Sequence, residues 1–308
     1  MRIDVHQHLW PEPLLDALRA RTVPPRLDGW VLHTHSAPPY AVNPADHDVA
    51  ARAALVAADG FDRALISLSS PLGIEWLPAA EATPLLDAYH AGVAALPGQF
   101  GAWAAAGLDE IDTVALERAL DAGCVGLQLP ADALVDPAGY QRCGPLLEVL
   151  ERRDAPLFVH PGPHPAPPAG APDWWPALSP YVHQMHDAWH AFVAFGRAAH
   201  PSLRVCFALL AGLGPLHGER LAARGGPARR RVDVDAFVET SSYGPRGVDA
   251  IVRVLGVDLV VLGSDRPYAT VPDFGFGPAF DHALAVANPG RLLYGKEGNR
   301  ELRRPTST

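Results

Sequence analysis

Two histidines near the start of the chain are spaced for metal binding. His6 and His8 close the segment IDVHQH, whose first residues read as a strand from Arg2 to Val5. Side chains two residues apart on a strand point to the same side, so both imidazoles project together from the strand's C-terminal end. Imidazole is the commonest nitrogen ligand of zinc and similar ions. Two imidazoles do not hold a catalytic metal alone, so this pattern requires further ligands elsewhere in the chain.

A second H-x-H pair, His33 and His35, has a different setting. It lies among Pro38, Pro39 and Tyr40 rather than at the end of a strand, and the chain has 14 histidines, so such a pair is not rare. We interpret this pair as part of a solvated loop, with a place in the pocket wall as the alternative.

Two further polar residues follow apolar segments in the same way as the first pair. His160 ends the run 156–159, and Asp265 follows the run 259–262 within GSDRP. If these runs are strands of a barrel, polar residues at their C-terminal ends face the site. Three imidazoles and one carboxylate give a four-ligand centre that can keep a position open for water or substrate. The carboxylate can also accept or deliver a proton beside the metal.

The elements that would position these residues alternate along the chain. Short apolar runs are followed by helical patterns, and β-branched runs between helices favour a parallel sheet covered on its outside. No glycine-rich phosphate loop follows the first strand, which argues against a doubly wound open sheet. The sequence therefore predicts an α/β fold, a (β/α)8 TIM barrel with the metal site at the C-terminal end of its strands. The predicted strands are 2–5, 64–68, 100–106, 125–129, 156–159, 203–209, 236–240 and 259–262; the predicted helices are 44–59, 79–96, 113–122, 145–153, 181–199, 215–224, 248–255 and 277–287.

The chain is predicted to form one domain. Its 308 residues fit a single barrel, since such barrels run to about 250 residues before insertions. Two long loops, at about 9–43 and 161–180, are rich in proline and tryptophan. In a barrel the loops that follow strands build the active site, so these two are the predicted walls or lid.

Composition excludes several classes of function. The formal net charge is −9, and the run 229–231 is the one arginine cluster, so no nucleic-acid partner is expected. No apolar stretch reaches the roughly 20 residues of a membrane helix, and the first residues lack the apolar core of a signal peptide. Three cysteines without CxxC spacing read as reduced thiols. We expect a cytoplasmic protein that acts on a small molecule without a membrane partner.

The motifs HQH, VHP and GSDRP, in this order and spacing, resemble those of the amidohydrolase superfamily. The resemblance runs from residue 2 to about 290 and is strongest to the amidohydrolase-2 branch, which contains aminocarboxymuconate-semialdehyde decarboxylase and the resorcylate-type decarboxylases. It implies that His6, His8, His160 and Asp265 bind a divalent metal and that Asp265 also moves a proton. It leaves a homodimer open, because relatives of this branch are often dimers.

The resemblance also implies that the centre holds a single metal ion. Other members of the superfamily bridge two metals with a carboxylated lysine on the fourth strand, and the segment 125–129 has no lysine. Zinc is the expected ion. A site of three histidines and one aspartate also suits manganese or another transition metal.

The chain departs from the family pattern on the sixth strand. The family carries a histidine there, in a stretch similar to FAHxGG, whereas this chain has Leu209 after Phe207 and Ala208. A leucine cannot take a proton from a metal-bound water, which affects hydrolysis more than protonation of a carbon by Asp265. His186 and His190, which share one face of the predicted helix 181–199 with His183, are the predicted catalytic replacements.

Three further residues are predicted to bind substrate. Trp174, beside Trp175 in the loop 161–180, would give an apolar aromatic wall. Arg246 and Arg266 follow the seventh and eighth strands and could clamp a carboxylate. Surface roles for both arginines remain the alternative.

Three functions stay open at this point. The first is decarboxylation of a small carboxylated aromatic or unsaturated compound, with Asp265 as proton donor and the metal as Lewis acid. The second is metal-dependent hydrolysis of an amide, lactone or ester, with metal-bound water and Asp265 as base. A replacement base near Leu209, such as His186 or His190, would distinguish this function. The third is a barrel that binds a metal or ligand without turnover. A fold does not choose between them, so the choice depends on the site.

Overall fold

A computed structural model describes residues 1–35, 37–226 and 232–295 of the chain. The arginine run 229–231 lies outside these described residues. Within them, eight parallel strands form two hydrogen-bonded sheets, in the orders β1-β5-β6 and β11-β10-β9-β8-β7. The strands are β1 (Ile3–His8), β5 (Arg63–Ser67), β6 (Phe100–Ala102), β7 (Leu127–Pro130), β8 (Leu157–His160), β9 (Val205–Phe207), β10 (Ala236–Glu239) and β11 (Val260–Val261).

Two bridges join the sheets into a ring. Ala104 pairs with Leu127 where β6 meets β7, and Gln7 pairs with Arg266 where the end of β1 meets the segment after β11. The Val5 amide also donates to the Leu262 carbonyl at 2.9 Å. The strand order therefore closes on itself, as the predicted (β/α)8 barrel requires, and the C-terminal ends of all strands meet at one mouth.

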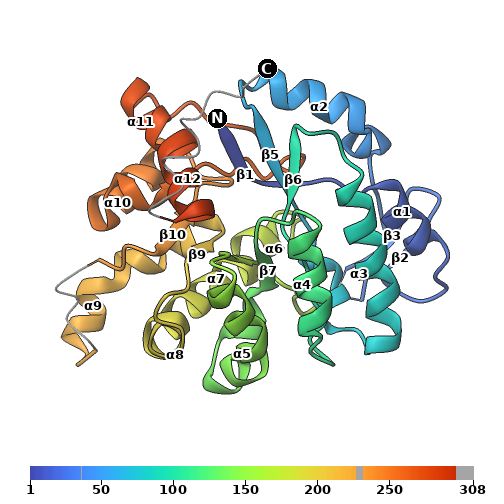
Figure 1. Cartoon of the computed structure of the whole chain (residues 1–308), viewed down its shortest axis with the longest axis horizontal. Helices are drawn as coiled ribbons and strands as arrows, with labels where there is room; N and C mark the ends of the chain where they lie inside the picture. Colours follow the sequence, from blue (N-terminus) through green and yellow to red (C-terminus); the bar gives the residue numbers. More distant parts are fainter. Residues whose placement is uncertain (36, 227–231, 296–308) are drawn as a thin grey trace.

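Helices surround the strands, and Figure 1 shows their colours running round the ring in chain order from α2 to α11. The longer helices bury apolar side chains on one face; α10, for example, buries Val248, Ile251 and Leu255, which are spaced three and four residues apart. The helices of the ring are α2 (Val49–Ala58), α3 (Ala79–Ala94), α4 (Thr113–Asp121), α5 (Pro137–Arg152), α7 (Pro180–Ala191), α8 (Arg197–Ala199), α9 (Gly218–Ala223), α10 (Pro245–Leu255), α11 (Pro278–His282) and α12 (Asn288–Tyr294).

Several predicted helix boundaries were wrong for local reasons. Helix α5 begins at Pro137, eight residues before the predicted start, because the Asp136 side chain caps the Gly139 amide while Pro145 is tolerated inside the helix. The predicted helix 44–59 is split, since Asp48 ends a 3₁₀ turn (Pro44–His47) and caps α2 through the Ala51 amide. The predicted helix 181–199 contains a π-helical turn, Phe192–Gly196, between α7 and α8.

The segment 9–43, predicted as a long loop, contains elements of its own. Helix α1 (Glu12–Arg19) buries Leu14, Leu15 and Leu18. It is followed by an antiparallel sheet of three short strands, β2 (Arg26–Asp28), β3 (Val31–His33) and β4 (Tyr40–Ala41). The second long loop, 161–180, contains the short helix α6 (Trp175–Leu178). Both segments follow barrel strands, so both begin at the mouth.

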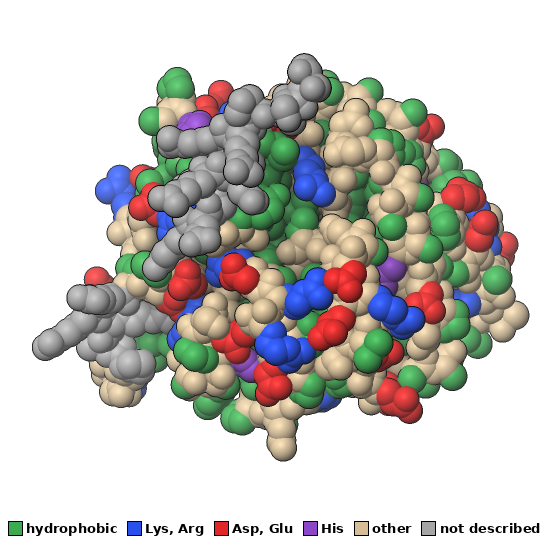
Figure 2. Space-filling model, in the orientation of Figure 1, with side chains coloured by type: hydrophobic (Ala, Val, Ile, Leu, Met, Phe, Trp, Pro, Cys, Tyr) green, Lys and Arg blue, Asp and Glu red, His purple; other side chains and the backbone are tan. Residues whose placement is uncertain are grey.

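Surface properties agree with the charge pattern of the sequence. Figure 2 shows acidic and basic side chains mixed on the drawn face rather than sorted into one sign. No helix among the described residues combines the length and the apolar character needed to cross a membrane. The cysteines Cys124, Cys143 and Cys206 are free thiols.

Candidate metal centre

Four side chains from three places in the sequence gather at the mouth of the barrel. His6 and His8 come from the end of β1, His160 is the last residue of β8, and Asp265 lies four residues beyond β11. One ligand atom from each lies within 4.8 Å of every other, and this is the one such group among the described residues. The Nε2 atoms of His6 and His8 are 3.0 Å apart. The Asp265 Oδ1 atom lies 3.7 Å from the first and 3.4 Å from the second.

The other ring nitrogen of each histidine faces an oxygen acceptor. His8 Nδ1 lies 3.1 Å from the Ser67 carbonyl, His160 Nδ1 lies 2.8 Å from the Pro161 carbonyl, and His6 Nδ1 lies 3.3 Å from Glu239 Oε1. Each acceptor favours the tautomer with hydrogen on Nδ1, which leaves the Nε2 lone pair free for a ligand. Converging lone pairs repel one another unless a cation lies between them. The donor set therefore fits a divalent transition metal with nitrogen and oxygen ligands.

Glu239 lies beside His6. Its carboxylate is completely buried at the end of β10. Besides His6 Nδ1, it accepts hydrogen bonds from the Leu209 amide (2.9 Å) and the Ser241 amide (2.6 Å). Gly263 leaves room for it, because a Cβ atom there would lie 2.1 Å from Glu239 Oε2. A buried carboxylate bonded to a ligating histidine fixes the orientation of the ring.

The environment acts differently on the three imidazoles. Burial opposes protonation of His6, but the neighbouring carboxylates of Glu239, Asp265 and Asp4 together outweigh it and raise the pKa of His6. Burial lowers the pKa of His8. Burial, together with His6 and His8, holds the pKa of His160 well below its usual value. His8 and His160 are therefore kept in the neutral form that binds a metal.

Asp265 is the member of the group that reaches toward solvent. Its side chain is 16% exposed, against 1% for His6 and 2% for His8. Its backbone has φ of 59°, in the left-handed region that non-glycine residues rarely adopt, and its amide donates to the His6 carbonyl at 2.9 Å. Strained backbone of this kind is found at functional sites when the surrounding structure holds it. Ser242, also at positive φ, places its Oγ 3.5 Å from Asp265 Oδ2.

Leu209 occupies an unusual turn beside the group. Residues 209–213 all have φ between 48° and 61°, which is a left-handed run that costs roughly 1–2 kcal/mol for each non-glycine residue. The Leu209 amide is held by Glu239, and Gly212 packs so closely on α7 that a Cβ atom there would lie 2.3 Å from the Val182 carbonyl. The position where the family pattern has a histidine is thus tied to the metal group through its backbone, and its side chain is apolar.

The predicted catalytic histidines lie together on α7, outside the four-residue group. The ring centroid of His186 lies 4.6 Å from that of His190 and 5.1 Å from that of His217, which ends the Leu209–His217 segment. Helix α7 is nevertheless connected to the mouth, because Gln184 accepts from the Gly162 amide and donates to the Pro163 carbonyl, just after His160. The catalytic roles of His186 and His190 stay predictions.

The predicted substrate-binding residues have three different settings. Trp174 is 59% exposed at the start of α6 and stacks at an angle on Trp175, with a centroid separation of 6.1 Å. Arg246 is exposed in the first turn of α10. The guanidinium of Arg266 instead forms two hydrogen bonds to Asp59, at 2.7 and 3.0 Å. A substrate carboxylate would have to compete with Asp59 for Arg266.

Several residues around the group were not singled out from the sequence. Tyr268 packs its ring on His8, with a centroid separation of 5.5 Å, and Ser69 Oγ lies 3.3 Å from His8 Nδ1. Arg52, Gln7 and Asp4 form a buried polar network behind β1. Charged residues in otherwise apolar segments, such as Arg52 in VAARAALVAA and Glu239 in AFVE, were a usable signal, because a buried charge requires a partner.

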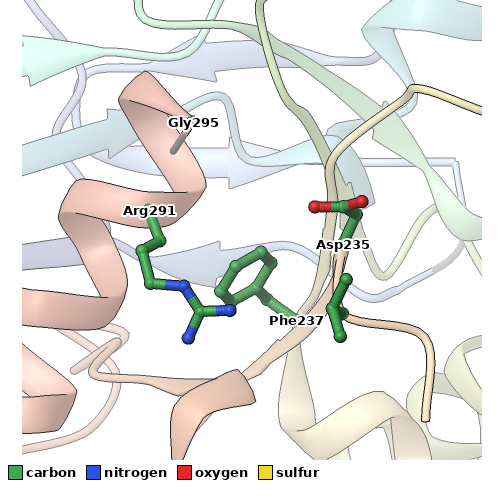
Figure 3. Close-up of a pocket in the computed structure, with 5 residues that line it drawn as sticks. Asp235, Phe237, Arg291 and Gly295 are labelled. Carbon is green, nitrogen blue, oxygen red and sulfur yellow. The ribbon is translucent and has the colours of Figure 1, made fainter. Parts of the chain in front are cut away.

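A separate cavity lies at the opposite end of the barrel. Val234, Asp235, Phe237, Arg291 and Gly295 line a space of about 240 Å³. Figure 3 shows the Phe237 ring between Arg291 and Asp235, and the Arg291 guanidinium lies 5.7 Å from the ring centroid. These residues surround the beginning of β10, whereas Glu239 ends the same strand at the mouth. The cavity is therefore distinct from the metal group.

Comparison with solved structures identifies the fold. The chain aligns with Metarhizium anisopliae IDCase in its apo form at a TM-score of 0.73 and 18% identity, over 97% of this chain and 98% of that one. It aligns with 5-carboxyvanillate decarboxylase from Sphingomonas paucimobilis at a TM-score of 0.70 and 19% identity, over 95% and 98% of the two chains. The chain shares their fold. The sequence itself matches no protein-family model and no curated protein.

A third solved structure contains a metal and a ligand. It is 5-carboxyvanillate decarboxylase from Novosphingobium aromaticivorans, complexed with manganese and 4-hydroxy-3-methoxy-5-nitrobenzoic acid. The match has a TM-score of 0.70 and 16% identity, over 95% of this chain and 96% of that one. At such identities the likeness establishes the barrel fold, and the chemistry has to be argued from this chain's own residues.

Proposed function

We propose that this protein is a metal-dependent decarboxylase of the amidohydrolase superfamily, acting on a small carboxylated aromatic or unsaturated compound. The observation that carries the proposal is the group of His6, His8, His160 and Asp265, in which the carboxylate alone of the four is appreciably exposed at the mouth. The proposed cofactor is one divalent ion, zinc by ligand type or manganese as in the solved neighbour. When bound, it would act as a Lewis acid toward a substrate carboxylate and a neighbouring oxygen.

The chain's own residues orient the metal ligands and transfer the proton. Glu239 orients His6, and the Ser67 and Pro161 carbonyls orient His8 and His160. Protonated Asp265 gives its proton to the ring carbon that bears the carboxylate. The bond from that carbon to the carboxylate then breaks, its electron pair restores the ring, and carbon dioxide leaves. Asp265 regains a proton from solvent, to which it is partly exposed.

Decarboxylation is favoured over hydrolysis by the environment of Leu209. Hydrolysis in the family pattern uses a sixth-strand histidine beside Asp265 to activate water, and here the side chain at that position is aliphatic while its amide is engaged by Glu239. Decarboxylation uses Asp265 as its proton donor and needs no base there. Candidate substrate contacts come from Trp174 and Arg246, which are exposed on segments that follow β8 and β10.

The test combines metal content with product analysis. Elemental mass spectrometry should find about one equivalent of zinc or manganese in the protein, and His6→Ala/His8→Ala should lose it. The loaded protein should release carbon dioxide from at least one member of a panel of hydroxylated aromatic acids, and Asp265→Asn, which keeps an oxygen ligand but no acid, should not. Turnover of amides, lactones or esters instead would favour hydrolysis. Bound metal without either activity would favour a binding barrel, and absence of metal after loading would overturn the site.

A further inference from the structure

The barrel closes at a seam that separates the proposed metal ligands. On one side is β1 with His6 and His8, and on the other is the segment 262–266 with Asp265. Backbone hydrogen bonds cross the seam from His8 to the Arg266 carbonyl (2.7 Å) and from Asp265 to the His6 carbonyl (2.9 Å). The separation between the histidines and the aspartate therefore depends on how this seam is held.

Arg52 on α2 joins both sides of the seam. Its side chain is buried, with 3% of the residue exposed. Nη1 donates to the His8 carbonyl at 2.7 Å and to the Asp46 carbonyl at 2.9 Å. Nη2 donates to Gln7 Oε1 at 2.6 Å and, more weakly, to the Arg266 carbonyl at 3.4 Å. One planar guanidinium thus holds the last residue of β1 and the residue after Asp265.

The network continues beneath β1 to the other side of the seam. Gln7 Nε2 donates to Asp4 Oδ2 at 2.8 Å, and Asp4 Oδ1 accepts from the His6 amide (3.1 Å) and the Ser264 amide (3.0 Å). Asp4 and Gln7 are completely buried. Asp4 therefore binds the amides of His6 and of the residue before Asp265 at once. The Gln7 side chain links the Asp4 carboxylate to the guanidinium of Arg52, because it donates to the first and accepts from the second.

We propose that Arg52 is a positioning residue for the metal. Through Gln7, Asp4 and the two carbonyls it sets the separation between His6, His8 and Asp265, and so determines metal affinity without touching the ion or the substrate. The inference rests on the proposed metal site. Removing outer partners of metal ligands typically weakens binding by about 10- to 100-fold, which gives the expected size of the effect.

Arg204, at the opposite end of the barrel, provides a matched control. It is 7% exposed and precedes β9. It donates to the Leu292 carbonyl at 2.7 Å and to the carboxylate and carbonyl of Asp154. Arg52 and Arg204 are therefore both buried guanidiniums that bind backbone carbonyls, and they differ in whether the bound segments carry proposed ligands.

The experiment measures metal affinity and stability separately. The apo proteins of wild type, Arg52→Lys, Gln7→Leu and Arg204→Lys are titrated with Co²⁺ by visible absorption and with Zn²⁺ by competition, and each apo protein is melted. Both arginine variants should melt at a lower temperature than wild type. Arg52→Lys and Gln7→Leu should weaken metal binding by about 10- to 100-fold, whereas Arg204→Lys should change it by less than about twofold.

Each outcome bears on a distinct statement. A wild-type protein that binds neither ion overturns the proposed metal centre. A wild-type protein that binds metal, with unchanged affinity in Arg52→Lys and Gln7→Leu, overturns the role of Arg52 alone. An equal loss of metal affinity in Arg204→Lys also overturns the role of Arg52, because the loss would then result from lower overall stability of the protein. If Arg52→Lys does not fold, Gln7→Leu decides, since it removes this link and leaves the guanidinium.

Discussion

Each end of the barrel contains a buried arginine that binds backbone carbonyls, but the segments that the two arginines hold differ in role. At the mouth, Arg52 binds the carbonyls of His8 and Arg266, beside three of the four proposed ligands. At the opposite end, Arg204 binds the carbonyls of Leu292 and Asp154, next to the cavity lined by Phe237 and Arg291. Buried guanidiniums stabilise both ends, but the described residues gather three histidines and a carboxylate at the mouth.

This difference follows from strand direction. In a parallel barrel the loops after the strands meet at the mouth, where chemistry can be varied without disturbing the sheet, and the opposite end serves stability. Strand β10 shows both roles within four residues: Phe237 packs near the cavity, and Glu239 bonds to His6. Substitutions at the two ends should therefore separate stability from metal binding.

The largest expected effect comes from these two positions of β10. Phe237→Ala removes a buried ring, so the free energy of unfolding should fall by about 3–5 kcal/mol, with metal affinity changed by less than about twofold. Glu239→Gln should cost less stability, about 1–3 kcal/mol. The glutamine side chain has one acceptor oxygen, so it cannot accept from the Leu209 and Ser241 backbone amides on two separate oxygens as the carboxylate does. Its metal affinity should fall by about tenfold or more. Urea denaturation and Co²⁺ titration measure the two quantities, and parallel losses in both variants would contradict the comparison.

The next effect concerns pH and belongs to the mouth. His47 stacks on Trp10 with a centroid separation of 4.5 Å and accepts a hydrogen bond from the Trp10 amide through Nδ1 at 3.0 Å. Burial, followed by the charge of Arg52, lowers the pKa of His47 to about 4. The unfolded chain protonates His47 near pH 6.5, whereas the folded chain protonates it only near pH 4. The contribution of neutral His47 to the free energy of unfolding is therefore fully present above pH 6.5 and is lost as the pH falls toward 4.

His47→Gln should remove this part of the pH dependence. Between pH 7 and pH 4.5 the free energy of unfolding of the apo protein should fall by about 2–3 kcal/mol less in the variant than in wild type. Chemical denaturation at several pH values measures the difference. Parallel curves for the two proteins would show that His47 is protonated as readily in the folded chain as in the unfolded one.

The smallest expected effect distinguishes two arginines near the mouth. Arg266→Ala breaks the forked ion pair with Asp59, whose members are each 16% exposed, and should cost about 1 kcal/mol. Arg246→Ala removes an exposed side chain and should change the free energy of unfolding by less than about 0.5 kcal/mol. A rise in KM in Arg246→Ala at unchanged stability would support its proposed contact with substrate, and an unchanged KM would remove it from the pocket.

The sequence was sufficient to predict the barrel and the grouping of four polar residues. The prediction worked because strand ends of a parallel barrel converge, so His6, His8, His160 and Asp265 could be placed together from their positions after apolar runs. Helix boundaries were less predictable, as in α5, where a cap at Asp136 outweighed the apparent start at Pro145. The segment 9–43 has the sequence pattern of a loop because α1 is short and begins among prolines.

Long-range polar contacts could not be read from the sequence. Arg52 binds residues 44 and 214 positions away, and Glu239 binds a histidine 233 positions away. A single sequence shows that such charges are embedded among apolar residues but not which partner each one has. The ion pair between Arg266 and Asp59 is of the same kind, since 207 positions separate its members.

The seam between β1 and the segment 262–266 has a consequence for synthesis of the protein. Synthesis of His6 and His8 precedes that of their partner across the seam, Asp265, by more than 250 residues. At typical rates of about 5–20 residues per second, the early histidines wait for tens of seconds before Asp265 exists. The metal centre can therefore be completed only after residue 265 has been added, and a chain terminated before that residue would lack the carboxylate that completes the group.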